Sequence, residues 1–283
     1  MWRSAIRSCN SLRNVYSSTV HFNRTAAMGH SDGKLKGKVA VVTASTDGIG
    51  FAIAKRLARE GAKVVVSSRK QNNVDNAVAK LKAEGHTVTG VTCHVSKASD
   101  RQNLLKVADS NFGGIDIIVS NAAVNPTVSQ VLECPEEVWD KIFEVNVKAA
   151  FLLSKEALPY LRKRGGGSII YISSIAGYQP LGLLGAYSVS KTALLGLTKA
   201  ASVDLAKDNI RVNCVAPGIV KTRFSSALYE SEETNEITLS QIPMRRLAHP
   251  DEISGIVSFL CSEDASYITG ETIIASGGMP SRL

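Results

Sequence analysis

The stretch V-A-V-V-T-A-S-T-D-G-I-G, residues 39–50, decides the fold of this chain of 283 residues. A short apolar run suited to a buried strand leads into a turn, and the apolar residues Ile49, Ile53 and Leu57 follow with helical spacing. Gly61 is suited to the left-handed C-cap that ends such a helix. The stretch therefore predicts a strand, a tight turn and a helix in direct succession.

The same alternation of apolar runs and helical segments continues to the end of the chain. Continuous apolar strands separated by helices are typical of a parallel sheet covered on both faces. We expect an α/β fold, a single doubly wound Rossmann domain over residues 34–280 with a mostly parallel seven-stranded sheet and no second domain. The seven runs are residues 39–43, 64–66, 88–95, 115–119, 168–172, 210–215 and 272–275.

The turn in the opening stretch also suits a phosphate group. Backbone N–H groups and the positive end of the helix meet there, and the two glycines allow a ligand to approach the backbone closely. We expect a dinucleotide site, with a tight turn that binds nothing as the alternative. The expected cofactor contacts in this turn are Thr43, Ser45, Asp47, Gly48, Ile49 and Gly50.

The end of the second apolar run, V-V-V-S-S-R-K, indicates the type of cofactor. About 20 residues beyond such a turn, an acidic residue would hold the ribose 2′-hydroxyl of NAD. Ser68 and Arg69 stand at that place, and a guanidinium accepts a 2′-phosphate through charge-assisted hydrogen bonds. The pair favours NADPH/NADP+ as the cofactor, against the alternative of a solvated basic strand end.

The net charge of +8 is concentrated at the N-terminus. Residues 1–40 contain seven Lys or Arg and one acid, a charge of +6, which leaves only +2 for the other 243 residues. Proteins that bind nucleic acid carry their basic surface on the folded domain, so we expect no nucleic-acid partner. Residues 1–33 form an N-terminal extension that resembles a mitochondrial transit peptide. A disordered tail and initiation at Met28 are the alternatives.

Neither a membrane span nor a metal site is expected. No run approaches the ~18 consecutive apolar residues that suggest a membrane helix. The five cysteines are widely spaced without a C-x-x-C pair, and the five histidines include no H-x-x-x-H pair. The cysteines are expected to be reduced and mostly buried.

A second pattern, A-Y-S-V-S-K-T at residues 186–192, carries acid–base chemistry. Tyr187 and Lys191 are four residues apart and share one helix face, which brings an ammonium beside a phenol. A free tyrosine has a pKa of about 10, and a nearby positive charge favours the phenolate, so we expect a lowered pKa. Alone, the pair also fits a solvated helix surface. Ser174, thirteen residues before Tyr187, strengthens the catalytic interpretation.

Several motifs together resemble the short-chain dehydrogenase/reductase family over residues 36–279. They are T-A-S-T-D-G-I-G, S-N-A-A (Ser120–Ala123), Asn146, Ser174, Y-S-V-S-K and P-G-I-V-K-T (Pro217–Thr222). Any one of these motifs is common, but their joint spacing is specific. The resemblance implies a doubly wound fold, a nicotinamide cofactor and a hydride-transfer reaction.

The resemblance assigns roles at the reaction centre. Tyr187 is implied as the proton donor to the carbonyl oxygen, and Ser174, rather than Ser173, as the residue that binds and polarises that oxygen. Lys191 is implied to lower the Tyr187 pKa and to bind the nicotinamide ribose, which places both Tyr187 and Lys191 among the cofactor contacts. Asn146 is implied to hold a water that links Lys191 to solvent.

Two further cofactor contacts follow from the resemblance: Thr222 at the nicotinamide carboxamide and Asn121 along the cofactor. The chain departs from the family pattern elsewhere. Ala44 stands at a usual glycine, and Ala123 stands at another. His94 replaces the acid that usually meets the adenine, so no adenine contact is expected from it.

The expected activity is NADPH-dependent reduction of hydrophobic carbonyl compounds to alcohols, with aromatic ketones, α-dicarbonyls and retinal-like aldehydes as candidates. The alternatives are an alcohol or retinol dehydrogenase working in the oxidative direction, or an NADP(H)-binding regulatory protein without turnover. Two apolar segments, residues 177–186 and 223–243, are expected to select the substrate. Their leucines fit packing or subunit contacts equally well. The residues concerned are Leu181, Leu183, Leu184, Phe224, Leu228 and Tyr229.

The last three residues, Ser281-Arg282-Leu283, resemble the S-K-L peroxisomal address. A peroxisomal import receptor is therefore an expected partner, and the peroxisome the expected location. The N-terminal extension makes the mitochondrion the alternative. The family resemblance also implies a homotetramer.

Overall fold

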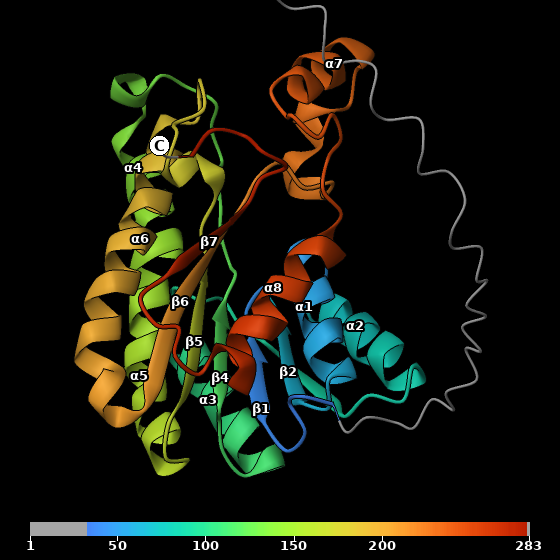
Figure 1. Ribbon diagram of the computed structural model, residues 1–283, viewed down its shortest axis with the longest axis vertical. Coiled ribbons are helices and arrows are strands. Elements are labelled where there is room, and N and C mark those ends of the chain that lie inside the picture. Colours follow the sequence, from blue (N-terminus) through green and yellow to red (C-terminus); the bar gives the residue numbers. More distant parts are fainter. Residues whose placement is uncertain (1–32, 282–283) are drawn as a thin grey trace, which may run out of the picture. The chain divides into compact units, whose positions relative to one another are not determined.

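Seven parallel strands form the centre of the domain in the computed structural model, which describes residues 33–281. The strands are paired in the order β3-β2-β1-β4-β5-β6-β7, so the sequence order reverses between β1 and β4 (Figure 1). In chain order they are β1 (Val39–Val42), β2 (Lys63–Ser68), β3 (Val88–Thr92), β4 (Ile117–Ser120), β5 (Gly167–Ile172), β6 (Ile210–Pro217) and β7 (Thr272–Ala275).

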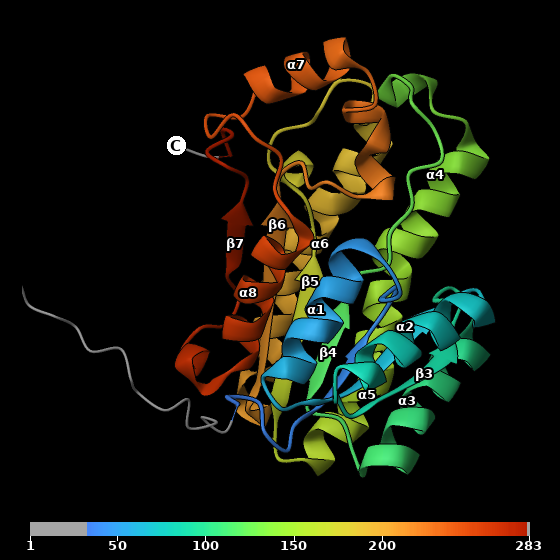
Figure 2. The ribbon, with the colours of Figure 1, turned by 90° about the vertical axis from the view of Figure 1, so that its right-hand side faces the viewer.

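Helices cover both faces of this sheet. In Figures 1 and 2, α1, α2 and α8 lie on one face, and α3, α5 and α6 lie on the other. The helices are α1 (Gly48–Arg59), α2 (Gln71–Ala83), α3 (Ala98–Phe112), α4 (Glu136–Phe143), α5 (Ala149–Lys163), α6 (Gly185–Leu205), α7 (Glu232–Ser240) and α8 (Pro250–Cys261). A π-helical turn, η2 (Glu144–Lys148), joins α4 to α5.

Alternation along the strands explains why the sheet has two hydrophobic cores. Ala40 and Val42 of β1 face the cluster that contains Leu57 of α1, whereas Val39 and Val41 face the cluster that contains Leu153 of α5. Successive side chains of a strand point to opposite faces, so a strand that is apolar throughout needs cover on both sides. The predicted doubly wound fold is therefore confirmed.

The strand boundaries differ from the sequence prediction in one informative place. The third strand ends at Thr92, and residues 93–95 continue beyond its last pairing with β2. The sheet is also wholly parallel, where a mostly parallel sheet was expected. Residues 1–32 of the expected extension, and Arg282 and Leu283 of the expected address, lie outside the described residues.

Within residues 33–281, no helix is both long and apolar enough to span a membrane. The same residues contain no group of three or more His, Cys, Asp or Glu side chains placed to hold a metal ion.

Candidate active site

A cleft of about 590 Å³ opens at the carboxyl ends of the central strands. This volume lies within the range of small-molecule and cofactor sites, and the place is where ligands bind in open α/β sheets. Nine of the residues predicted to contact a cofactor line this cleft. They are Asp47, Gly48, Ile49, Gly50, Ser68, Arg69, Asn121, Tyr187 and Thr222.

The turn after β1 has the backbone geometry that the sequence predicts. Asp47 is the N-cap of α1, and its Oδ1 accepts a hydrogen bond of 2.9 Å from the Gly48 N–H. Gly48 has a φ of +55°, a conformation that glycine adopts without strain. Gly50 has no room for a side chain, since a Cβ would lie 2.3 Å from the Ala44 carbonyl oxygen. The turn thus needs glycine at both places.

Ala44 adopts a φ of +49° in the same turn. This is the position at which the family usually has glycine, and the structure gives the reason. The left-handed conformation costs a residue with a Cβ roughly 1 kcal/mol, whereas glycine adopts it freely. The chain therefore forms this turn with some backbone strain.

Two residues predicted to contact the cofactor instead lie beneath the turn. Thr43 is fully buried, and its Oγ1 accepts hydrogen bonds from the backbone N–H groups of Asn121 (3.0 Å) and Ala122 (3.1 Å). Ser45 is also buried, donating to the Val42 carbonyl oxygen at 2.6 Å. These hydroxyls hold the ends of the strands in place and do not line the cleft.

The end of β2 carries the predicted basic residue into the cleft. Arg69 is exposed, and no described residue pairs with its guanidinium. Asn73, in the first turn of α2, lines the cleft beside it, and so does Ser68. No acidic side chain from β2 or α2 lines the cleft, so a 2′-phosphate meets no repelling charge from these elements.

Helix α6 brings Tyr187 to the cleft wall. Tyr187 is 9% exposed, and its hydroxyl forms a hydrogen bond with the side chain of Ser174, which follows β5. The neighbouring Ser173 is buried and donates to the Lys191 carbonyl oxygen at 2.8 Å. The structure therefore places Ser174, and not Ser173, beside the phenol.

The expected lowering of the Tyr187 pKa is contradicted by the structure. Burial raises the pKa of Tyr187 to about 12, and the hydrogen bond with Ser174 offsets this only in part. Lys191 is 2% exposed, and its Nζ donates to the Ile172 carbonyl oxygen at 2.8 Å while lying 5.5 Å from the centre of the Tyr187 ring. Burial also lowers the pKa of Lys191 to about 8. Desolvation is thus the largest cause of the pKa shift at both residues.

Asn146 lies in the π-helical turn η2 and is 1% exposed. Its amide exchanges two hydrogen bonds with the backbone of Val124, at 2.8 and 3.0 Å, and donates to Ser190 Oγ at 3.0 Å. Ser190 Oγ in turn donates to the Tyr187 carbonyl oxygen at 2.6 Å. The side chain therefore ties the loop that lines the cleft to the backbone of α6. The proposed water relay through Asn146 stays a prediction.

The segment after β6 closes the top of the cleft through three consecutive residues. The Thr222 methyl lies against Gly48, where a Cβ would be 3.3 Å from it. Arg223 pairs with Asp47, and the Phe224 ring lies 5.8 Å from the Tyr187 ring, centre to centre. This segment, Thr222–Phe224, joins the turn after β1 to the phenol.

Sequence reasoning missed part of the cleft wall. Cys93, His94 and Val95 line it because they follow the carboxyl end of β3, and that rule could have identified them. We expected His94 to make no contact with the adenine of the cofactor. Its position on the cleft wall does not support that expectation. Lys141 of α4 also lines the cleft, and no pattern in the sequence indicates this.

The two predicted substrate segments have mixed roles. Leu181 and Leu228 pack against a small buried cluster with Ile219 and Ile242, which is the packing role left open above. The hydroxyl of Tyr229 donates to the Thr222 carbonyl oxygen at 2.7 Å. Among the apolar residues proposed for substrate selection, Phe224 is the one that lines the cleft.

The chain belongs to the short-chain dehydrogenase/reductase family and is an NAD(P)-dependent oxidoreductase. The family model described as enoyl-(acyl carrier protein) reductase matches residues 43–280. A crystal structure of a protein assigned as a short-chain alcohol dehydrogenase from Sinorhizobium meliloti 1021 has a TM-score of 0.82 and 34% identity, covering 86% of this chain and 96% of that one.

Curated relatives are similar over most of their length. Dehydrogenase/reductase SDR family member 4 of rabbit, Oryctolagus cuniculus, is 59% identical over 249 residues, 88% of this chain and 96% of the rabbit protein. The pig protein of the same name, from Sus scrofa, is 55% identical over 279 residues, 98% of this chain and 100% of its own. Tropinone reductase-like 3 of Erythroxylum coca is 53% identical over 250 residues, covering 88% and 96%.

Several runs of the sequence outside the general family motifs resemble dehydrogenase/reductase SDR family member 4. The rabbit and pig relatives confirm this closer resemblance. The runs are V-V-V-S-S-R-K, V-S-N-A-A-V-N-P, S-K-T-A-L-L-G-L-T-K and F-L-C-S-E-D-A-S-Y-I-T-G-E-T.

Proposed function

We propose that this protein is an NADPH-dependent carbonyl reductase that converts hydrophobic ketones and aldehydes to alcohols. Aromatic ketones, α-dicarbonyls and retinal-like aldehydes are the substrate classes. One observation carries the proposal: a neutral, buried phenol, Tyr187, is hydrogen-bonded to Ser174 at the wall of the cleft that also contains the glycine turn and Arg69.

The residues fit a bound dinucleotide. The first turn of α1 offers backbone N–H groups to a pyrophosphate, Gly48 allows close approach, and Arg69 suits a 2′-phosphate. When bound, the cofactor supplies the hydride that attacks the carbonyl carbon. Thr222 and Asn121 line the cleft between the turn and the phenol, as contacts along the cofactor require.

Tyr187 and Ser174 act on the carbonyl oxygen. Ser174 donates a hydrogen bond to this oxygen and stabilises the negative charge that develops on it. Tyr187 donates its proton to the same oxygen, which completes the alcohol. Lys191 and Asn146 act from behind the cleft: Lys191 keeps a positive charge beside the phenolate that forms, and Asn146 fixes α6 through Ser190.

The protonation state of Tyr187 supports the reductive direction over the oxidative alternative. A phenol with a pKa of about 12 is protonated at physiological pH. Reduction needs this protonated form, because a proton must pass to the substrate, whereas alcohol oxidation needs a phenolate to accept one. Incubating the enzyme with NADPH and the three carbonyl classes, and with NADP+ and the matching alcohols, tests the direction. Faster oxidation than reduction at pH 7 would contradict the proposal.

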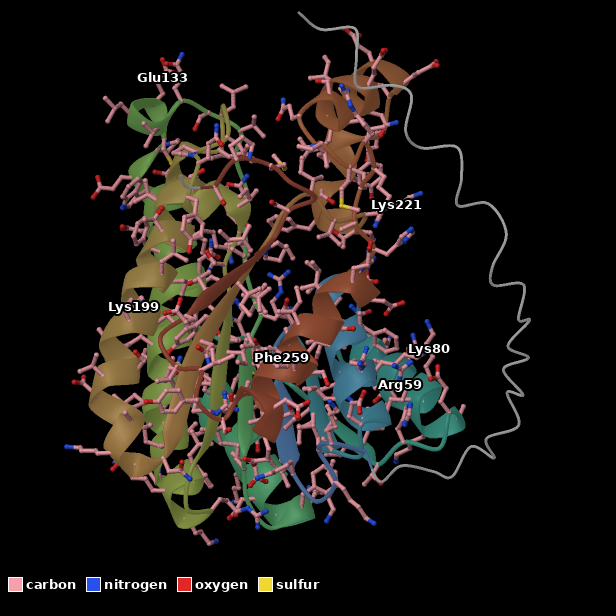
Figure 3. The ribbon with its side chains drawn as sticks, in the orientation of Figure 1. Arg59, Lys80, Glu133, Lys199, Lys221 and Phe259 are labelled. Atoms are coloured by element: carbon pink, nitrogen blue, oxygen red, sulfur yellow. The ribbon has the colours of Figure 1, made fainter. Side chains whose placement is uncertain are left out.

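Arg69 supports NADPH over NADH. Replacing Arg69 by Asp should raise the dissociation constant for NADPH about 100-fold, because a charge-assisted contact becomes a repulsion, while NADH affinity changes little. Lys80→Asp is the matched control. Lys80 is exposed on α2, the helix that follows Arg69, but it lies outside the cleft (Figure 3). Equal losses for both cofactors in Arg69→Asp would refute the preference for NADPH.

Phe224 supports a hydrophobic or aromatic substrate. It is 57% exposed, with its ring tilted 41° against Tyr187, and so offers an aromatic surface next to the proton donor. Phe224→Ala should raise KM for aromatic ketones more than for small aliphatic aldehydes. A variant with unchanged KM for every ketone would remove Phe224 from the substrate site.

The assembly is proposed to be a homotetramer, in line with the family. Two surfaces support it: the groove of α4, α5 and α6, where Phe151 is 47% exposed among charged side chains, and the edge beside β7, which is paired on one side only among the described strands. Phe259 of α8 is exposed on the same side as β7 (Figure 3). Sedimentation of the full chain tests the state, and Phe151→Glu should lower the assembled mass.

The peroxisome is the proposed location, with Ser281-Arg282-Leu283 read by a peroxisomal import receptor and the mitochondrion as the alternative. Imaging the full chain with and without these three residues decides between them. An unchanged location after their removal would dismiss the C-terminal address.

A further inference from the structure

Arg223 bridges the two sides of the cleft mouth. It is the first residue of the 3₁₀ helix η5 (Arg223–Leu228), and its guanidinium contacts Oδ2 of Asp47 through both Nε and Nη2. Both residues line the cleft. Their side chains are 82% and 55% exposed, and an ion pair this exposed contributes little to stability. Stability therefore does not account for the pair.

Asp47 creates an electrostatic difficulty for the dinucleotide. Its Oδ1 accepts a hydrogen bond from the Gly48 N–H, so the carboxylate sits at the N-terminus of α1. That helix end is where the pyrophosphate is expected, and a carboxylate there repels it. A positive charge at this place would offset the repulsion, and Arg223 is the cation paired with Asp47.

Asp47 engages only some of the N–H donors of the Arg223 guanidinium. A guanidinium has five N–H donors in a planar fork. Asp47 engages Nε and Nη2, and Nη1 has no partner among the described residues. The neighbouring Thr222 lies against Gly48, which holds the backbone of this segment next to the turn. Arg223 is therefore anchored at the cleft mouth with N–H groups to spare.

We propose that Arg223 binds the pyrophosphate of the dinucleotide and is held in place for this by Asp47. The proposal rests on the proposed function in one respect, that the dinucleotide occupies this cleft. It assigns Arg223 a different part of the cofactor from Arg69. The pyrophosphate is common to NADPH and NADH, whereas the 2′-phosphate belongs to NADPH alone.

The two arginines can be separated by binding measurements without turnover. NADPH and NADH are titrated into the full chain, and energy transfer from protein to nicotinamide fluorescence gives each dissociation constant. Arg223→Gln should raise both constants by the same factor, about tenfold, because one charge-assisted contact is lost. Lys221→Gln is the matched control: Lys221 is exposed two residues earlier and lies outside the cleft (Figure 3). Its constants should stay within about twofold of wild type.

Three results would overturn the proposal. The first is an Arg223→Gln variant that binds both cofactors as wild type does. The second is a loss confined to NADPH, which would move Arg223 to the 2′-phosphate. The third is a loss accompanied by earlier thermal unfolding of the free variant, which would make the role structural.

A double variant distinguishes contact from charge neutralisation. Asp47→Asn keeps an N-cap side chain but removes the repelling charge. If Arg223 binds the pyrophosphate, Asp47→Asn/Arg223→Gln should recover only the part of the loss that repulsion by Asp47 causes, and should still bind NADPH more weakly than wild type. Recovery to wild-type affinity would mean that Arg223 only offsets Asp47, contrary to the proposal. A wild-type chain that binds neither cofactor would refute the proposed function itself, whereas wild-type binding that Arg223→Gln retains refutes this inference alone.

Discussion

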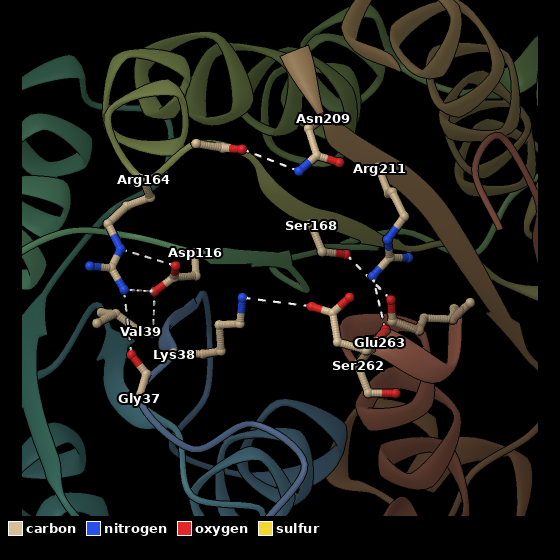
Figure 4. A network of polar contacts seen from close by, with 12 residues as sticks. Gly37, Lys38, Val39, Asp116, Arg164, Ser168, Asn209, Arg211, Ser262 and Glu263 are labelled. Atoms are coloured by element: carbon tan, nitrogen blue, oxygen red, sulfur yellow. Dashed lines mark hydrogen bonds and ion pairs between the residues drawn. The ribbon is translucent and has the colours of Figure 1, made fainter. Parts of the chain in front are cut away.

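Charged groups at the two ends of the sheet differ in their partners. At the amino end, shown in Figure 4, Asp116 precedes β4 and accepts hydrogen bonds from the Val39 N–H at 2.8 Å and from Arg164 at 3.0 and 3.2 Å. Arg211 of β6 donates to the carbonyl oxygens of Ser262 and Ile268, both at 3.3 Å. These groups are satisfied by the protein itself.

At the carboxyl end, charged and polar groups face a cleft. Among the described residues, Arg69 and the Nη1 of Arg223 have no partner, and the Lys191 ammonium is buried against one carbonyl oxygen. The difference teaches where stability and function reside. Substitutions at the amino end should cost stability and spare activity, whereas those at the carboxyl end should cost activity and spare or even improve stability.

Tyr187→Phe should give the largest effect. Loss of the proton donor should lower kcat about 1000-fold, equal to about 4 kcal/mol, with NADPH affinity within about twofold. Tyr171→Phe is the matched control, since Tyr171 is a buried phenol of β5 that bonds Ser154 Oγ at 2.7 Å and lies outside the cleft. It should lose about 1 kcal/mol of stability and keep its kcat. A Tyr187→Phe variant that keeps a tenth of wild-type kcat would contradict the role.

Asp116→Ala should give the largest loss of stability. The change leaves the Val39 N–H and the Arg164 guanidinium without their acceptor, which should cost about 3 kcal/mol in the free energy of unfolding. Denaturant unfolding measures this loss, and kcat of the folded fraction should be unchanged. Asp264→Ala, which breaks the exposed pair with Lys34, should cost less than about 1 kcal/mol. Equal losses of unfolding free energy in Asp116→Ala and Asp264→Ala would show that the buried carboxylate contributes no more to stability than the exposed one.

Lys191→Met should stabilise the protein in a pH-dependent way. Below about pH 8, Lys191 is charged in both the folded and the unfolded state, so the cost of burying the charge is fully present. A drop in pKa from 10.5 to about 8 corresponds to roughly 3 kcal/mol, offset by about 1 kcal/mol from the bond to Ile172. The Met variant should thus be more stable by about 2 kcal/mol at pH 7.

Between pH 8 and pH 10.5 the unfolded wild-type chain binds more protons than the folded one, so wild-type stability rises relative to the variant and the gap closes. Unfolding curves at pH 7, 9 and 10.5 measure the trend. A gap that widens with pH would show that the Lys191 pKa is raised.

Ala44→Gly should give the smallest effect. Glycine relieves the left-handed strain at φ +49° but adds entropy to the unfolded chain, which should leave a gain of about 0.5 kcal/mol. Ala79→Gly in the exposed part of α2 should instead lose about 1 kcal/mol. The melting temperatures of the two variants should move in opposite directions, and a loss in both would place no strain at Ala44.

Much of this molecule follows from local sequence. Apolar runs predict the seven strands, and backbone requirements predict the turn at Gly48 and Gly50. The shared direction of the strands places Ser174 beside Tyr187. These signals lie within a few residues of the feature that they predict, or follow from the common direction of the strands.

The rest depends on tertiary placement. The direction of the Tyr187 pKa shift could not be predicted from the sequence. It depends on how deeply α6 buries the phenol and on where the Lys191 ammonium points. Thr43 was expected at the cofactor, yet its hydroxyl holds the start of the loop after β4. Lys141 reaches the cleft from a helix with no motif.

The hydrogen bonds that hold α6 also bear on the thermodynamics of substrate binding. Ser173, Thr192 and Ser190 fix the helix to β5, to Gly177 and, through Asn146, to the loop at Val124. The conformational entropy of placing the phenol is thus lost when the chain folds, and not when substrate arrives. Calorimetry of substrate binding should then show a heat-capacity change no larger than the buried apolar surface accounts for, with no additional component from ordering of the chain.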